Sequence, residues 1–216
     1  MALCDELGIY VMAEADIESH GFVAIERPNV RDQDKLSRLE INFRAFDLAG
    51  KWTSDNPDGR EAYLDRAVQL VERFKNHTSV IFWSLGNEAS YGQNHIDMCH
   101  RIKRADPIRL IHYEGDRHGV TTDMYSIMYL TPDELRKSVA ERTDRPLIHC
   151  EFAHSMGNGP GGLVDYVEAY RSEKLLQGEF VWQWCNHGLL KKKKAAYPIM
   201  HMEETLEIIP MTQTSF

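Results

Sequence analysis

The sequence predicts a parallel α/β fold, and three of its patterns lead to that prediction. Short apolar runs, rich in β-branched and aromatic residues, alternate with longer stretches whose apolar side chains recur at helical spacing. Buried strands that alternate with helices pair in parallel, with the helices covering the sheet. Polar residues also follow several of the apolar runs directly. That arrangement is typical of a (β/α)₈ barrel, whose active site is built at the carboxyl ends of its strands.

The expected strands are short runs in which β-branched or aromatic side chains dominate. They cover Ile9–Ala13, Val80–Leu85, Arg109–Tyr113, Met124–Tyr129, Pro146–Cys150 and Glu179–Trp184. The expected helices cover Arg60–Asn76, His95–Arg104, Pro132–Arg142 and Leu163–Lys174. Thr131 caps the third of these helices, and Glu134 completes its capping box. The polar stretch Glu26–Pro57 is expected to be a long loop.

The composition argues against several classes of protein. The 216 residues carry 33 acidic and 25 basic side chains, a net charge of −8, which disfavours a nucleic-acid partner. We find no apolar run long enough to span a membrane, and the first residues lack the apolar segment of a secretory signal. The four cysteines, Cys4, Cys99, Cys150 and Cys185, form no C-x-x-C pair. We therefore expect a cytoplasmic protein without disulfides.

Two glutamates each follow an expected strand. Glu88 comes after the run Val80–Leu85, within SLGNEAS, and Glu151 comes directly after Pro146–Cys150. Glycoside hydrolysis needs two such carboxylates, one to protonate the leaving oxygen and one to attack the anomeric carbon or activate water. A strand-end glutamate is more often a partner in an ion pair, so spacing alone does not assign catalysis.

The segment Glu18-Ser19-His20 lies just past the first expected strand. If these alternate residues point the same way, a carboxylate and an imidazole can share one ion, and oxygen-rich donors suit Mg²⁺. An isolated E-x-H is also compatible with a solvated loop. Trp182 can pack in the core or offer a flat apolar platform to a sugar ring. Tyr113 can stabilise a carboxylate through its hydroxyl or simply be packed.

Five longer segments, taken in order, resemble the catalytic barrel of β-galactosidases of glycoside hydrolase family 2. They are CDELGIYVMAEADIESHG, NHTSVIFWSLGNEASYGQNH, HYEGD, RPLIHCEFAHSMGNG and LQGEFVWQWCNHGL, and the resemblance runs from about Leu3 to Leu190. The resemblance implies a fragment of a TIM (β/α)₈ barrel, roughly strands 3 to 8 with their helices, truncated at both ends. It also implies retaining hydrolysis of terminal non-reducing β-D-galactose from β-galactosides such as lactose, in carbohydrate catabolism.

The same resemblance gives each candidate residue a role. Glu88 falls on the acid/base and Glu151 on the nucleophile, and Tyr113 is expected to support the nucleophile. Three residues are expected to contact the galactose: Asn87, His154 and Trp182. Three are expected to bind Mg²⁺: Glu18, His20 and Glu88. Na⁺ is a further expected cofactor, with an incomplete site in this chain, and intact members of the family often form homo-oligomers.

The end of the chain departs from the family. We expect residues 1–190 to form the partial barrel and residues 191–216 to be a disordered tail. DNA encoding Pro198–Phe216 can, in a frame shifted by two bases, encode YYAYGGDFGDYPNDSNF, the kind of segment that the family places after its last barrel strand. Methionine has a single codon, so Met200, Met202 and Met211 constrain that reading. We therefore expect a frameshift, a missed intron or a degraded gene near the lysine run.

Three other functions stay open at this point. A β-glucuronidase or β-mannosidase of the same family would use the same two carboxylates. A non-catalytic sugar-binding or pseudogene remnant would keep Glu88 and Glu151 without the closed barrel that preorganises them. A metallohydrolase would instead depend on Glu18, His20 and Glu88 alone.

Overall fold

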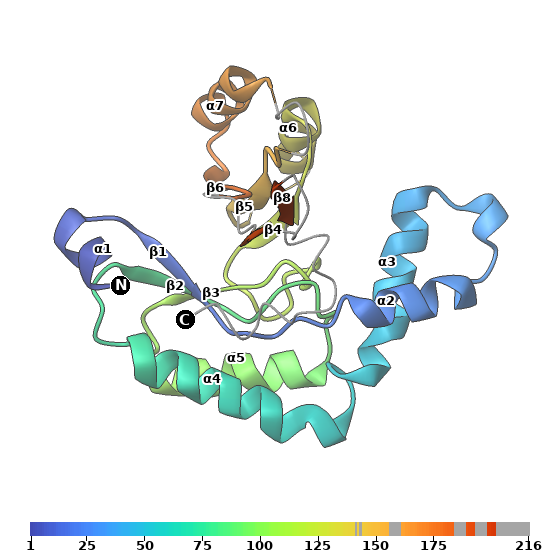
Figure 1. Cartoon of the computed structure of the whole chain (residues 1–216), viewed down its shortest axis with the longest axis horizontal. Coiled ribbons are helices and arrows are strands. Elements are labelled where there is room, and N and C mark those ends of the chain that lie inside the picture. Colours follow the sequence, from blue (N-terminus) through green and yellow to red (C-terminus); the bar gives the residue numbers. More distant parts are fainter. Residues whose placement is uncertain (141, 143, 156–160, 184–188, 193–197, 202–216) are drawn as a thin grey trace.

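The described residues form two small parallel sheets with helices packed around them, together with one two-stranded antiparallel ribbon (Figure 1). A computed structural model describes residues 1–140, 142, 144–155, 161–183, 189–192 and 198–201. In this part of the chain, no helix is both long and apolar enough to cross a membrane.

The strands form two three-stranded parallel sheets, β1-β2-β3 and β4-β5-β6. They are β1 (Val11–Glu14), β2 (Val80–Ser84), β3 (Leu110–His112), β4 (Tyr125–Met128), β5 (Leu147–Phe152) and β6 (Leu176–Val181). All six lie at predicted positions, although β6 begins three residues earlier than expected. The prediction of a parallel α/β fold and a partial barrel is therefore confirmed.

Helices connect the strands. They are α1 (Ala2–Leu7), α2 (Gly21–Glu26), α3 (Arg38–Ala49), α4 (Arg60–Phe74), α5 (Gln93–Ala105), α6 (Pro132–Ala140) and α7 (Leu163–Ser172). In Figure 1, α4 and α5 run side by side beneath the first sheet, α6 and α7 lie with the second sheet, and α2 and α3 extend to one side. Within each sheet a helix follows each strand and leads to the next parallel strand, as in a barrel, whereas residues 113–124 between β3 and β4 contain no helix.

Hydrogen bonds join the two sheets between β3 and β4. The backbone N–H of Asp123 donates to the carbonyl of Ile111, at 2.9 Å. The imidazole Nε2 of His112 lies 2.7 Å from the hydroxyl of Ser126. We call these two contacts the sheet junction. It keeps the carboxyl ends of the two sheets on the same side of the molecule.

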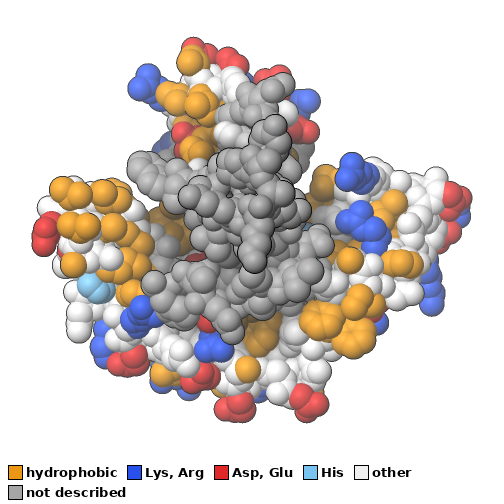
Figure 2. Space-filling view, in the orientation of Figure 1, with side chains coloured by type: hydrophobic (Ala, Val, Ile, Leu, Met, Phe, Trp, Pro, Cys, Tyr) orange, Lys and Arg blue, Asp and Glu red, His pale blue; other side chains and the backbone are white. Residues whose placement is uncertain are grey.

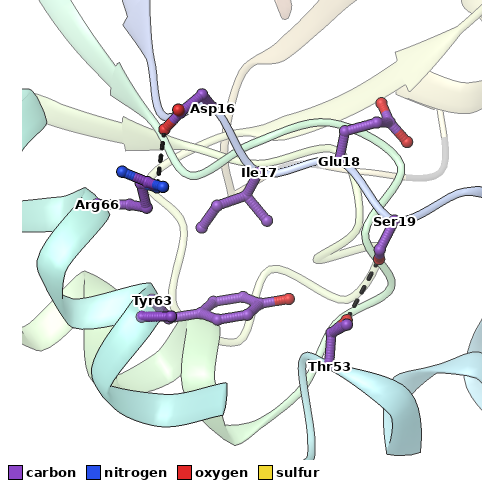
Figure 3. A pocket seen from close by; sticks show the side chains of 8 residues that line it. Asp16, Ile17, Glu18, Ser19, Thr53, Tyr63 and Arg66 are labelled. Atoms are coloured by element: carbon purple, nitrogen blue, oxygen red, sulfur yellow. Dashed lines mark hydrogen bonds and ion pairs between the residues drawn. The ribbon is translucent and has the colours of Figure 1, made fainter. Parts of the chain in front are cut away.

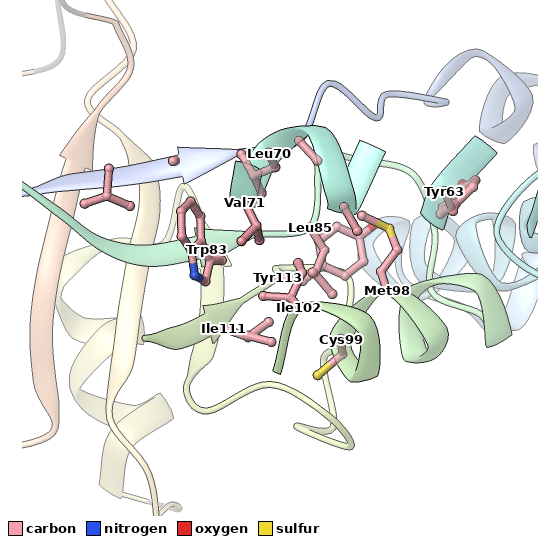
Figure 4. Packing of buried hydrophobic residues seen from close by; sticks show 14 residues of the cluster. Tyr63, Leu70, Val71, Trp83, Leu85, Met98, Cys99, Ile102, Ile111 and Tyr113 are labelled. Carbon is pink, nitrogen blue, oxygen red and sulfur yellow. The ribbon is translucent and has the colours of Figure 1, made fainter. Parts of the chain in front are cut away.

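The core of the first half lies between its sheet and the helices α4 and α5 (Figure 4). Trp83, Leu85, Met98, Ile102 and Tyr113 are fully buried there. Full burial of a large apolar side chain stabilises a fold by about 1.5–3 kcal/mol. The burial of these side chains fixes the strands, and with them the loops that follow their carboxyl ends.

The expected long loop Glu26–Pro57 is wrong over much of its length. Its middle is the helix α3, which packs on α2 around the buried residues Val23, Val30, Ala45 and Ala49. A capping box starts α3: Ser37 accepts from the backbone N–H of Glu40, whose carboxylate accepts from the N–H of Ser37. The sequence pattern did not reveal this helix, because its apolar side chains are spread around the helix and do not recur on one face.

The first sheet has an open edge at β1. In the sheet order β1-β2-β3, β1 pairs on one side with β2 and has no described strand on its other side. Exposed apolar side chains lie beside that edge, on α1 and the residues after it, including Leu3, Leu7, Ile9 and Tyr10. Figure 2 shows hydrophobic side chains gathered at this end of the molecule. A closed eight-stranded barrel has no such edge, because each of its strands pairs on both sides.

The predicted tail overlaps a small antiparallel ribbon. Strand β7 (Leu189–Lys192) pairs with β8 (Pro198–His201). Part of the segment expected to be disordered is therefore a strand. Residues 193–197 and 202–216 lie outside the described residues, so the expected domain boundary and frameshift stay predictions.

The capping box of α3 leads to a first prediction. Ser37→Ala removes the side-chain acceptor for the N–H of Glu40 and should lower the free energy of unfolding by about 1 kcal/mol. Urea unfolding and amide hydrogen exchange across α3 measure the effect. Ser37→Asp is the matched control, because aspartate also caps helices. Equal exchange in Ser37→Ala and the unchanged chain would contradict the assignment.

Candidate active site

The loops after β1 and β2 lie against each other at the carboxyl edge of the first sheet. Glu18 and Asn87 form an isolated parallel bridge, and the N–H of Asn87 donates to the carbonyl of Ile17 at 2.8 Å. The side-chain amide of Asn87 donates to Glu18 Oε2, also at 2.8 Å. The other oxygen of Glu18 accepts from the backbone N–H of His20 at 2.9 Å. These two hydrogen bonds fix the orientation of the Glu18 carboxylate between Asn87 and His20.

His20 and Glu88 face each other across these two loops. The Nδ1 atom of His20 lies 2.5 Å from Glu88 Oε2, and the imidazole rests edge-on against Phe46. The hydrogen bond with Glu88 raises the pKa of His20. Desolvation raises the pKa of Glu18, and the charge of Glu88 adds to that effect. The pKa values of His20 and Glu18 therefore both depend on the neighbouring groups.

Glu18, His20 and Glu88 form a group that fits a divalent cation. One ligand atom from each lies within 4.8 Å of the others. Two carboxylates and one imidazole, partly open to solvent, leave room for the waters that Mg²⁺ retains. The structure thus brings together all three residues predicted as cation ligands. Whether a cation occupies them stays a prediction, because exposed acidic groups are common without an ion.

Glu151 lies on β5, in the second sheet, and is held by a tyrosine. The hydroxyl of Tyr129, just after β4, donates to Glu151 Oε2 at 2.5 Å. Desolvation raises the pKa of Glu151, while the Tyr129 hydroxyl opposes the rise. The negative charges of Glu88 and Glu18 raise the pKa of Glu151 further.

His154 and Trp182 lie at the same edge of the second sheet. The ring of His154 stacks beside Tyr129, with centroids 6.4 Å apart, and its charge lowers the pKa of Glu151. The backbone N–H of Trp182 donates to the carbonyl of Phe152 at 2.9 Å, which ties the end of β6 to the end of β5. Both side chains are half-buried. Their predicted contact with a sugar stays a prediction.

Tyr113 requires a correction, because the structure does not bring it to Glu151. Its side chain is fully buried in the core of the first half, where its ring stacks on His95 at 4.3 Å. Its hydroxyl donates to the carbonyl of Ser90 and accepts from the N–H of Ala89. The tyrosine that supports Glu151 is Tyr129.

Two further residues of this edge were given no role from the sequence, although Glu114 was among the polar residues noted at the strand ends. Tyr129 ends the expected strand Met124–Tyr129, so the rule that selected the other strand-end residues applies to it as well. Glu114 follows Tyr113, and its Oε1 accepts from the backbone N–H of Glu88 at 2.6 Å. Desolvation and the charges of Glu88 and Glu14 raise the pKa of Glu114 to about 8.

A cavity of about 190 Å³ lies behind the cation group, between the loop after β1 and α4 (Figure 3). The Asp16–Arg66 ion pair and the Ser19–Thr53 hydrogen bond cross its wall, each at 3.3 Å. Of the predicted site residues, Glu18 lines this cavity, whereas Glu88 and Glu151 do not. The cavity is therefore separate from the space between the two catalytic candidates.

A partial barrel with carboxylates after its strands is the arrangement expected of a glycosidase domain. Residues 1–202 match the family described as "Glycosyl hydrolases family 2, TIM barrel domain". The chain belongs to this family of glycosidases.

Within the family, the chain is similar to β-galactosidases. It is 45% identical over 194 residues to the β-galactosidase of Kluyveromyces lactis, which covers 87% of this chain and 19% of that protein. It is 37% identical over 202 residues to the β-galactosidase of Pectobacterium atrosepticum, covering 88% of this chain and 17% of that protein. The chain thus spans less than a fifth of the length of these relatives.

A solved structure shares the fold at lower identity. The β-glucuronidase of Ruminococcus gnavus in complex with uronic isofagomine is 16% identical, with a TM-score of 0.53. The similarity covers 86% of this chain and 36% of that one. At this level of identity the likeness concerns the fold alone.

The contact between Tyr129 and Glu151 leads to a second prediction. A hydroxyl that donates to a carboxylate stabilises its charged form, so Tyr129→Phe should raise the pKa of Glu151. NMR titration of ¹³C-labelled glutamate side chains follows that pKa. Tyr125→Phe is the matched control, because the Tyr125 hydroxyl donates to Asp144. A pKa of Glu151 that is unchanged or lower in Tyr129→Phe would contradict the assigned contact.

Proposed function

We propose that this chain carries the acid/base, the nucleophile and the cation ligands of a retaining β-galactosidase. The observation that carries the proposal is the placement of two held carboxylates at the ends of strands of different sheets: Glu88 after β2, bonded to His20, and Glu151 on β5, bonded to Tyr129. The β-galactosidase relatives, at 37–45% identity, support galactose as the sugar. The substrate would be a terminal, non-reducing β-D-galactoside such as lactose.

The chemistry follows from the two carboxylates. Glu88 donates a proton to the leaving oxygen as the glycosidic C–O bond breaks, and an oxygen of Glu151 bonds to the anomeric carbon. Glu88 then takes a proton from a water that displaces Glu151 and releases galactose. The hydrogen bond from the Tyr129 hydroxyl fixes the orientation of the Glu151 carboxylate. His154 and Trp182, beside Glu151, are placed to contact the sugar.

The donor set at Glu18, His20 and Glu88 fits Mg²⁺, as its two carboxylates and imidazole indicate. A bound cation would supply positive charge that favours the ionised form of Glu88. The amide of Asn87 orients Glu18 in that group, and its contact with the galactose remains a proposal from the resemblance. Na⁺ and assembly into homo-oligomers remain proposals from the resemblance.

A chimeric enzyme tests the function, because this chain spans only part of its relatives. Residues 1–190 would replace the aligned segment of the Kluyveromyces lactis β-galactosidase. We expect hydrolysis of nitrophenyl β-galactoside above that of the β-glucuronide and β-mannoside. A preference for either of those two sugars would overturn the galactosidase assignment, and a folded but inactive chimera would favour a non-catalytic remnant.

The nucleophile is tested in the same chimera. Glu151→Gln removes the attacking carboxylate and should lower kcat by about 10³-fold or more without unfolding the protein. Glu168→Gln is the matched control, because Glu168 is an exposed glutamate on α7. Circular dichroism verifies the fold of both variants. Near-normal turnover in Glu151→Gln would remove the nucleophile assignment.

The cation ligands are tested in the chain itself. His20→Gln should weaken binding of Mn²⁺, used as a paramagnetic substitute for Mg²⁺, by about tenfold or more, measured by electron paramagnetic resonance. His118→Gln is the matched control, because His118 is exposed and lies outside the group. Equal Mn²⁺ affinity in His20→Gln and the unchanged chain would exclude His20 as a ligand.

A further inference from the structure

The turn that carries Glu88 has an unusual backbone. Three of its residues have positive φ: Gly86 at 137°, Glu88 at 41° and Ser90 at 62°. Glycine adopts such angles freely, but Glu88 and Ser90 carry a Cβ atom that disfavours the left-handed region. Contacts from outside the turn must therefore hold Glu88 and Ser90 in this conformation.

Two consecutive residues after β3 make those contacts with three consecutive residues of the turn. Glu114 Oε1 accepts from the backbone N–H of Glu88 at 2.6 Å. The hydroxyl of Tyr113 accepts from the N–H of Ala89 at 3.2 Å and donates to the carbonyl of Ser90. We call Tyr113 and Glu114 the turn clamp. All of its bonds go to backbone atoms of the turn.

The turn clamp is rigid because its surroundings leave it no space to shift. The ring of Tyr113 is fully buried and stacks on His95. A Cβ atom on Gly115 would lie 2.5 Å from the Tyr113 ring and 2.8 Å from the Ser90 carbonyl. The backbone at Gly115 is therefore packed so closely against Tyr113 and Ser90 that a larger residue would not fit. On the far side of the turn, the Ser90 hydroxyl donates to the carbonyl of Phe46 at 2.8 Å.

We propose that Tyr113 and Glu114 are positioning residues that fix the backbone of Glu88, and through it the direction of the Glu88 carboxylate toward His20. The proposal rests on the proposed function of Glu88 as acid/base and cation ligand. Tyr113 thus acts on the acid/base turn after β2. A purely structural tyrosine would contribute to stability without affecting the cation group or kcat.

Substitutions that keep or remove single atoms test the turn clamp. Tyr113→Phe keeps the ring and removes the hydroxyl. Glu114→Met removes the acceptor, whereas Glu114→Gln retains a side-chain oxygen that can accept the N–H of Glu88. Tyr63→Phe is the matched control, because Tyr63 belongs to the same core and lines the cavity of Figure 3.

Three measurements are made on each variant: amide exchange of Glu88 and Ala89 by NMR, Mn²⁺ affinity of the chain, and kcat and KM of the chimera. We expect Tyr113→Phe to speed exchange at Ala89 and Glu114→Met to speed exchange at Glu88, each about tenfold or more. Both should weaken Mn²⁺ binding several-fold and lower kcat more than they raise KM. Glu114→Gln should restore most of each quantity, and Tyr63→Phe should match the unchanged chain.

The proposal is overturned if exchange at Glu88 and Ala89 stays unchanged, or if it rises while Mn²⁺ affinity and kcat stay as in the unchanged chain. If Tyr113→Phe does not fold, the comparison of Glu114→Met with Glu114→Gln decides, since both keep the buried tyrosine. If the unchanged chain binds no Mn²⁺, the cation part of the proposed function fails, and kcat in the chimera still decides the turn clamp.

Discussion

Crowding of negative charge at one edge is the physical constraint on which this site depends. Parallel strands bring their carboxyl ends together, and five glutamates gather there: Glu14, Glu18, Glu88, Glu114 and Glu151. Like charges in a partly desolvated space oppose ionisation. Each carboxylate therefore needs a hydrogen-bond donor, a cation or a proton of its own. The site is the set of groups that meet this need.

The hydrogen-bond donors to these carboxylates come from different structural elements. Each carboxylate therefore has its own environment and can have its own role. Asn87 and the backbone N–H of His20 serve Glu18, and Tyr129 serves Glu151. Burial and neighbouring charge keep Glu114 protonated near neutral pH, so it contributes a hydrogen-bond acceptor with little added charge. Environments that separate the protonation of neighbouring carboxylates are typical of glycosidase sites.

Much of this arrangement could be predicted from the sequence, because buried strands leave apolar runs and the residues after them share one edge. That rule found Glu18, His20, Glu88 and Glu151. The helix α3 was missed because its apolar side chains are spread around the helix and give no helical periodicity, although Ser37 and Glu40 match the capping-box pattern at its start.

The choice of tyrosine failed for a different reason, which is the alternation of side chains along a strand. His112 contacts Ser84 and Ser126 on the inner side, so the next residue, Tyr113, points to the helices α4 and α5. A role assigned from a sequence resemblance matches the residue type but does not show which way the Tyr113 side chain points. Contacts between distant segments, such as Glu114 with the N–H of Glu88, likewise leave no local pattern in the sequence.

The sheet junction between β3 and β4 has a consequence for the product of the reaction. Glu88 belongs to the first sheet and Glu151 to the second, so the hydrogen bonds from Asp123 to Ile111 and between His112 and Ser126 help to set their separation. Carboxylates about 5–5.5 Å apart give the β-anomer of the released sugar from a β-glycoside, and those about 6.5–9.5 Å apart give the α-anomer. A displacement at this junction would therefore alter the separation of the two carboxylates, which is the quantity that distinguishes retaining from inverting glycosidases.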